Sequence, residues 1–148
     1  MRAKQNSGER GHALVELALL CPWIFFLFLA IFNFGIFAHA MISAANAARV
    51  AALYTSASKE TAADSLFACF YAVEEMRSLQ NVGSTATCDA AGTSAGGALK
   101  VQAKYLAAGP GDGAPASEVT VTYTTIPLLT IPFIRNQLTV TRTARMRI

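Results

Sequence analysis

Charged residues are scarce in this chain of 148 residues. Asp, Glu, Lys and Arg together make up 14% of it, against about 25% in a typical soluble chain. This scarcity argues against an ordinary soluble enzyme. Hydrophobic residues make up 53%, so a disordered chain, which needs few apolar residues and a high net charge, is excluded. The length suits about one domain, and the apolar residues gather near the N-terminus, which indicates one membrane segment followed by a small soluble domain.

Residues that commonly perform catalysis or bind metals are also few. The two histidines, His12 and His39, are far apart, and the three cysteines form no CxxC pair. A metal site is therefore not expected. The sequence contains no phosphate-binding glycine motif, no GxSxG and no HExxH. It predicts a protein that is not an enzyme and holds no metal or cofactor.

The longest stretch without a charged residue runs from Leu17 to Ala48. Its most apolar part, residues 17–38, satisfies the requirement of about 20 apolar residues for crossing a bilayer. As a helix, the whole stretch would be about 48 Å long, whereas the hydrocarbon core is about 30 Å thick. We therefore expect a transmembrane helix that continues outside the membrane as an alanine-rich stalk.

The residues that flank this stretch predict its orientation. Arg2, Lys4 and Arg10 precede it, and positive charge beside a span favours the cytoplasmic side. The N-terminus is expected inside and the C-terminal domain outside. A secretory signal peptide is the competing interpretation, because residues 38–40 form an A-x-A triplet. The run is longer than the apolar core of a signal peptide, about 7 to 15 residues, and has Glu16 near its start, which favours a retained helix.

Glu16 stands at the entrance to the apolar run, where drawing an ionised side chain to mid-bilayer costs on the order of a few kcal/mol. Five positions before it is Gly11, in the sequence GHALVE. A basic leader, a glycine, a glutamate at the fifth position after it and an apolar helix together resemble type IV prepilins and pseudopilins. Residues 9–35, with the alanine-rich residues 44–54, are similar to the TadE-like proteins of tight-adherence (Flp-type) pilus systems.

This resemblance implies that a membrane prepilin peptidase cleaves after Gly11 and leaves His12 as the new N-terminus. Glycine suits the position before the scissile bond, because a residue without a side chain lets the protease approach the backbone closely. The resemblance further implies a minor pilin or pseudopilin of the bacterial inner membrane. Its partners would be the prepilin peptidase, other minor pilins and the major pilin of a pilus used for surface adhesion.

A role in assembly is the second expectation for Glu16. Cleavage creates an α-amino group on His12, and pairing with the Glu16 carboxylate of a neighbouring subunit would offset the desolvation cost of both charges. The alternative is an uncleaved bitopic anchor, in which Glu16 only extends its carboxylate into the cytoplasmic interface. In that case the external domain would be an envelope binding module.

Other residues of the apolar helix are expected to affect its shape and packing. Pro22 lacks the backbone donor for the carbonyl of Ala18, which predicts a kink. Cys21 is expected to act as a small apolar residue. Small side chains either allow neighbouring helices to approach closely in lipid or are simply tolerated. They are Gly35, Ala40, Ala44, Ala47, Ala48 and Ala51.

The remaining residues, 56–148, are expected to form an extracytoplasmic α+β domain, after a leader at 1–11 and a transmembrane and stalk helix at 12–55. Residues 61–80 have the apolar spacing of an amphipathic helix. Either a break near residues 56–60 separates this helix from the stalk, or the two form one continuous helix. The apolar positions of this second helix are Ala62, Leu66, Cys69, Phe70, Val73 and Met76.

Alternating apolar and polar side chains predict three antiparallel strands after a loop at residues 81–97. They lie in residues 98–106, 118–124 and 137–148. The fold class is therefore α+β and pilin-like: a long N-terminal helix, a second helix and a small three-stranded antiparallel sheet.

A disulfide between Cys69 and Cys88 is expected. The first lies on the second helix and the second in the following loop, both on the side predicted to be external, where oxidation is normal. A domain of fewer than about 100 residues buries a modest core and gains from a covalent link.

An apolar connection, IPLLTIPF, lies between the second and third strands. Exposed, it would contact a partner or a membrane surface, and folded back it would cap the small core. Its candidate contact residues are Ile126, Pro127, Leu128, Leu129, Ile131, Pro132 and Phe133. The basic last strand lacks interleaved aromatic residues, so it is expected to be solvated or to pair with acidic groups rather than to bind nucleic acid.

Overall fold

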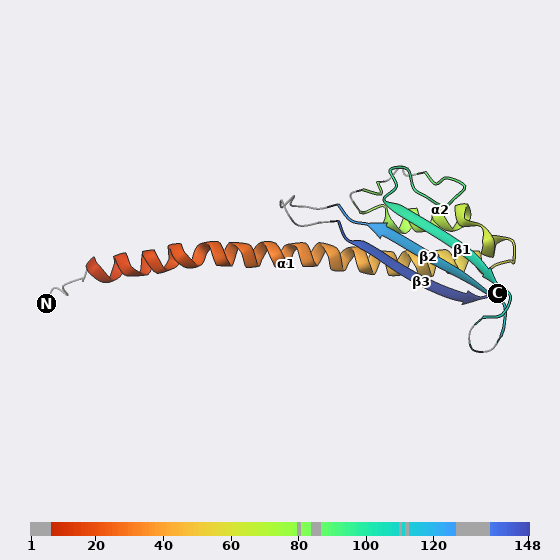
Figure 1. Ribbon diagram of the computed structural model, residues 1–148, viewed down its shortest axis with the longest axis horizontal. Helices are drawn as coiled ribbons and strands as arrows, with labels where there is room; N and C mark the ends of the chain where they lie inside the picture. The colour runs from red at the N-terminus through yellow and green to blue at the C-terminus, as the bar shows by residue number, and fades with distance from the viewer. Residues whose placement is uncertain (1–6, 80, 84–86, 110, 112, 127–136) are drawn as a thin grey trace. The chain divides into compact units, whose positions relative to one another are not determined.

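The expected α+β architecture is confirmed in the computed structural model (Figure 1). The structure describes residues 7–79, 81–83, 87–109, 111, 113–126 and 137–148, with side chains from Gly11 onward. The elements in chain order are α1 (Ser7–Thr55), a short 3-10 helix η1 (Thr61–Ala63), α2 (Ser65–Met76), β1 (Leu99–Leu106), β2 (Ala116–Thr124) and β3 (Thr139–Arg147). The chain divides into two compact units, Met1–Ile36 and Phe37–Ile148.

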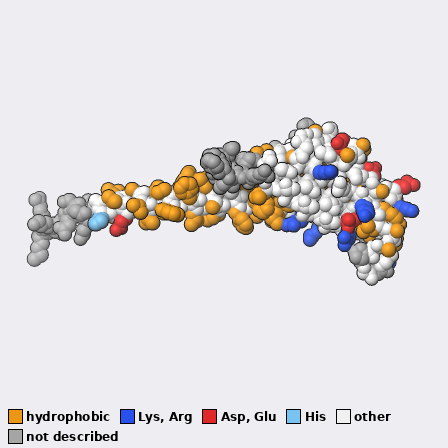
Figure 2. Space-filling model, viewed as in Figure 1, with side chains coloured by type: hydrophobic (Ala, Val, Ile, Leu, Met, Phe, Trp, Pro, Cys, Tyr) orange, Lys and Arg blue, Asp and Glu red, His pale blue; other side chains and the backbone are white. Residues whose placement is uncertain are grey.

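The first unit contains the N-terminal part of α1, whose large apolar side chains are exposed. Figure 2 shows hydrophobic side chains along this part of the helix. Residues 11–55 are long and apolar enough, as a helix, to cross a membrane. Asn33 interrupts the apolar run, but its side-chain amide donates to the carbonyl oxygen of Leu29 at 2.8 Å. This polar group is therefore satisfied within the helix, as a lipid environment requires.

The second unit begins with the C-terminal part of α1, where a face of small residues is buried. These residues belong to one hydrophobic core with α2 and the sheet. They are Ala40, Ala44, Ala47, Ala48, Ala51 and Ala52. The sequence left open whether such residues serve close packing between helices in lipid or are merely tolerated. Those from Ala40 onward pack closely, but within this chain's own domain, whereas Gly35 has no atom within 4 Å of an added Cβ.

Side-chain hydrogen bonds lie at the C-terminal end of α1 and at the N-terminal end of α2. The hydroxyls of Thr55 and Ser117 lie 2.7 Å apart and are both buried, which joins the end of α1 to β2. Residues 56–60 are not helical, so the predicted break is confirmed. Asp64 then caps α2, because its carboxylate accepts hydrogen bonds from the backbone N–H groups of Leu66 and Phe67 at 2.9 and 3.1 Å.

The buried face of α2 differs from the prediction. Leu66 and Phe70 were expected on it, but they are 44% and 66% exposed. Ala68 and Ala72 are buried instead, beside Cys69. Small side chains let the helix backbone approach the rest of the core closely, and this contact outweighs the burial of the two larger side chains.

The sheet has the order β1-β2-β3 and is antiparallel throughout. The predicted alternation is confirmed, since one face contributes buried apolar residues to the core. They are Leu99, Val101, Val119, Val121, Tyr123 and Val140. Leu138 is an exception, because it lies before β3 and is 50% exposed.

The loop before β1 covers one edge of the sheet. The backbone N–H of Val101 donates to the carbonyl of Gly92 at 2.7 Å. Gly92 has φ of +74°, and an added Cβ would collide with the carbonyl oxygen of Val101, so this close approach requires glycine. Cys69 and Cys88 form the predicted disulfide, with Cα atoms 6.1 Å apart. The disulfide fixes this loop to α2.

A buried tyrosine links the segment after α2 to the sheet. The hydroxyl of Tyr123 donates to the side-chain oxygen of Asn81, and the amide of Asn81 donates to the carbonyl of Thr124 at 2.7 Å. Burial raises the pKa of Tyr123 above its ordinary value of 10.0.

Removing the disulfide should lower the free energy of unfolding of the domain. We expect Cys69→Ala combined with Cys88→Ala to cost about 3 kcal/mol, the value for a closed loop of this length. Urea unfolding in detergent, followed by tyrosine near-UV circular dichroism, would measure it, because all four tyrosines lie in the second unit. Cys21→Ala is the matched control and should leave the midpoint unchanged, and an equal loss in the control would contradict this role.

The stabilising contribution of Tyr123 should be lost at alkaline pH. With its pKa raised in the folded state, the unfolded chain ionises first, so the contribution is complete below pH about 10 and declines as pH rises through the folded pKa. Tyr123→Phe should cost about 1 kcal/mol at neutral pH, from the lost hydrogen bond, and this difference should shrink above pH about 10. Urea titrations at several pH values would show it. Tyr54→Phe, which leaves Tyr123 in place, should retain the wild-type pH profile.

Candidate functional site

The residues predicted for processing and assembly lie in the first turns of α1. Gly11, His12 and Glu16 are all helical and exposed. His12 and Glu16 are four positions apart, which places them on the same face of the helix. Both side chains are therefore accessible to another molecule.

Among the described residues, nothing explains why a glycine occupies position 11. An added Cβ there would meet no atom within 4 Å, and its φ is not in the left-handed region that favours glycine. A glycine inside a helix destabilises it by about 1 kcal/mol relative to alanine. The described contacts therefore do not require glycine at position 11.

Glu16 lies at the edge of an extended exposed apolar surface. No further charged residue follows it before Arg49. The large apolar side chains exposed on this surface are Leu14, Val15, Leu17, Leu19, Leu20, Trp23, Ile24, Phe25, Phe26, Leu27, Phe28, Ile31, Phe32, Phe34 and Ile36. Such a surface requires a covering by lipid or by other apolar helices. The carboxylate at its edge is then at the boundary between water and an apolar medium.

The other predicted site residues lie elsewhere or are not described. α1 continues through Pro22, and the kink expected there stays a prediction. The disulfide belongs to the second compact unit, not to the first. Ile126 is 49% exposed, while residues 127–133 of the candidate contact loop lie outside the described residues. Within the described ranges, no group of three His, Cys, Asp or Glu side chains is arranged to hold a metal ion.

An exposed aromatic surface on α2 was not predicted from the sequence. Tyr71 stacks on Tyr54 with ring centroids 4.0 Å apart. The rings of Phe67 and Phe70 meet the Tyr71 ring edge-on at 5.1 and 5.5 Å. A cavity of about 420 Å³ adjoins this cluster and is lined by Asp64, Leu66, Phe67, Phe70, Thr87 and Cys88. The signal was present in the sequence, because the four large apolar residues within positions 66–71 form one apolar stripe at helical spacing and a second stripe lies opposite them. α2 buries the second stripe, which contains Ala68, Cys69, Ala72 and Val73.

Comparison with known proteins finds a similarity within α1. Residues 11–53 match the family described as TadE-like protein, while no curated protein and no solved structure matches the chain. The match begins at Gly11 and extends through both the exposed apolar surface and the alanine face of α1. The similarity to the TadE-like protein family therefore covers nearly all of the N-terminal helix and none of the sheet.

Proposed function

We propose that this chain is a minor pilin or pseudopilin. α1 holds it in the bacterial inner membrane with the N-terminus in the cytoplasm, and a prepilin peptidase cleaves it after Gly11. The processed subunit then takes part in the assembly or initiation of a Flp-type pilus that attaches cells to surfaces. Its role is structural rather than catalytic. The observation that carries the proposal is the exposed apolar surface of α1, which begins at Leu14, between Gly11 and Glu16.

The apolar surface supports membrane insertion and assembly together. Burial of apolar area stabilises by about 25 cal/mol per Å², so a helix that exposes Trp23 and its many Phe and Leu neighbours is strongly favoured in lipid. The same surface is available to other apolar helices once subunits leave the bilayer. A single helix thereby serves both as the membrane anchor and as the packing element of a filament.

The position of Glu16 supports a pairing between subunits. After cleavage, the new α-amino group belongs to His12, one helical turn before Glu16 on the same face. Within one subunit, the α-amino group of His12 is only weakly fixed beside the Glu16 carboxylate, because both groups lie at the free N-terminal end of the helix. In an apolar assembly, a carboxylate of one subunit and an amine of the next each lower the desolvation cost of the other. The pairing would fix the relative height of adjacent helices.

Cleavage should depend on the absence of a side chain at position 11. We expect Gly11→Val to reduce the processed fraction at least about tenfold, because tenfold corresponds to only about 1.4 kcal/mol of unfavourable contact in the transition state. The processed fraction would be measured by intact mass after co-expression with the cognate prepilin peptidase. Gly35→Val is the matched control, since an added Cβ at either position meets no atom within 4 Å. Normal processing of the Gly11 variant would contradict the cleavage site.

Assembly should depend on the charge of Glu16. Glu16→Gln keeps the size of the side chain and removes its charge, so we expect normal cleavage but several-fold fewer pili in cells that carry only this variant. Pili recovered by shearing and quantified by immunoblot would measure the effect. Glu60→Gln, an exposed carboxylate outside α1, is the control and should assemble normally. Wild-type pilus yield from the Glu16 variant would refute the pairing.

The permanent anchor is the second candidate function, and the exposed cavity beside α2 favours it. In that case the external domain would bind a ligand without any processing. The mass measurement separates the two proposals, because an anchor retains its N-terminal residues in the presence of the peptidase.

A further inference from the structure

The exposed side of α2 forms a rigid apolar surface, here called the aromatic face, which comprises Leu66, Phe67, Phe70 and Tyr71. Phe70 is 66% exposed, and no described residue covers it. The ring contacts to Tyr71, together with the stacking of Tyr71 on Tyr54, hold the cluster in place. A preorganised apolar surface of this kind is typical of a protein contact, because little side-chain entropy is lost on binding.

The aromatic face is too far along α1 to contact the membrane that α1 crosses. Tyr54, on which it stacks, lies 17 positions after Phe37, the first residue of the second unit. This separation corresponds to about 26 Å along the helix axis at 1.5 Å per residue, and the apolar run of α1 ends near Ala38. The occupant of the aromatic face is therefore expected to be a protein surface rather than lipid.

Carboxylates border the aromatic face and define the charge of its partner. Asp64 lies at the N-terminal end of α2, and Glu74 and Glu75 lie near the C-terminal end. Arg77 is paired with Glu74 at 2.8 Å, so the border remains acidic. Two aromatic faces brought together would place carboxylates against carboxylates, which disfavours a symmetric contact between them. The expected partner surface is cationic.

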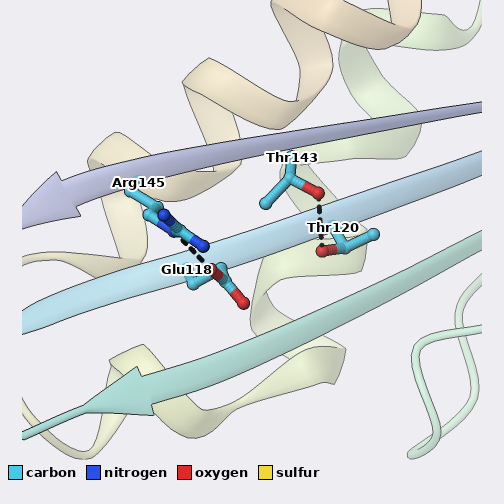
Figure 3. Close-up of polar contacts among 4 residues, drawn as sticks. All are labelled: Glu118, Thr120, Thr143 and Arg145. Atoms are coloured by element: carbon cyan, nitrogen blue, oxygen red, sulfur yellow. Dashed lines mark hydrogen bonds and ion pairs between the residues drawn. The ribbon is translucent and has the colours of Figure 1, made fainter. Parts of the chain in front are cut away.

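The same domain carries an uncovered surface of this charge on the outer side of its sheet, here called the threonine face. Figure 3 shows Thr120, Thr143, Glu118 and Arg145 on the side of the sheet that faces away from the helices. The hydroxyls of Thr120 and Thr143 lie 3.0 Å apart, and Glu118 pairs with Arg145.

The threonine face is cationic overall. Its exposed β1 side chains include Lys100 and Lys104, and the register aligns Lys104, Glu118 and Arg145 in one row across the three strands. Glu118 is thus outnumbered on this face by Lys100, Lys104, Arg145 and Arg147. Thr120 and Thr143 lie opposite each other in the next row of this face, and Thr122 and Thr141 lie in the row after it. Their methyl groups and the alkyl stems of lysine provide apolar area between the charges.

We propose that the aromatic face of one copy of this chain docks on the threonine face of a second copy. An apolar helix stripe and an uncovered sheet face are complementary surfaces in α+β layers, and here their charges are opposite. The two faces belong to different sides of the domain, because α2 lies on the inner side of the sheet, so one copy uses both at once. The contact is heterologous, because it joins two different faces, and it can therefore repeat head to tail along a row of copies.

This contact is separate from the proposed processing and from the pairing of Glu16, since it involves only residues of the external domain. Gly11→Val and Glu16→Gln leave its residues unchanged. A failure of the docking proposal therefore does not imply a failure of cleavage or of pilus assembly, and the reverse also holds.

Reciprocal charge reversal tests the docking in the full chain. Glu75→Arg makes the border of the aromatic face basic, and Lys104→Glu makes the row across the sheet acidic. We expect each variant alone to raise the dissociation constant for self-association at least tenfold, measured by sedimentation velocity in detergent. An equimolar mixture should recover the wild-type association, because each variant then supplies the charge that the other has reversed.

Two further variants keep the test decisive. Phe70→Ala should also weaken association at least tenfold, while the domain keeps its unfolding midpoint, because this side chain is largely exposed. Arg49→Glu changes the net charge by the same amount as Lys104→Glu but lies outside both faces, so it should associate as the wild type does. A monomeric wild type, unaltered association of the single variants, or a mixture that stays dissociated would each overturn the proposal.

Discussion

Burial of the alanine face of α1 is the contact on which the rest of the domain depends. From Ala40 to Ala52 the helix contributes small buried side chains to the core that it shares with α2 and the sheet. Before this point the same helix carries Phe, Leu and Ile on all sides, and these side chains are exposed. A change in side-chain size along one continuous helix therefore separates a surface that needs a lipid or protein covering from one that the chain covers itself.

Several local constraints keep this core closed in a domain with little apolar volume. The hydroxyls of Thr55 and Ser117 satisfy each other where the end of α1 meets β2, and the cap supplied by Asp64 starts α2 directly after the break. The disulfide and the backbone hydrogen bond at Gly92 then hold the loop against α2 and β1. Each replaces contact area that a larger core would provide, as expected for a small domain.

Much of this architecture could be predicted because periodicity and length are strong signals. The long helix and the three strands follow from such patterns, and the Cys69–Cys88 pairing follows from the expected external location of both cysteines. The orientation of α2 does not, because hydropathy gives little weight to alanine, whereas close approach depends on it: Ala68 and Ala72 face the core and Phe70 does not. The isolation of Gly11 and Glu16 has another cause. No contact among the described residues explains either one, and under the proposed function their partners are a peptidase and neighbouring subunits.

The central claim is that α1 is embedded in lipid before residue 38 and lies outside it beyond residue 40. Cys21 tests this directly, because it is an exposed free thiol. Full-length protein in sealed vesicles would be treated with a charged, water-soluble maleimide, with an Asn46→Cys variant in a Cys21→Ala background as the accessible reference, since Asn46 is exposed. The account predicts that Cys21 stays unmodified until detergent is added, while position 46 reacts at once. Rapid modification of Cys21 in intact vesicles would contradict it.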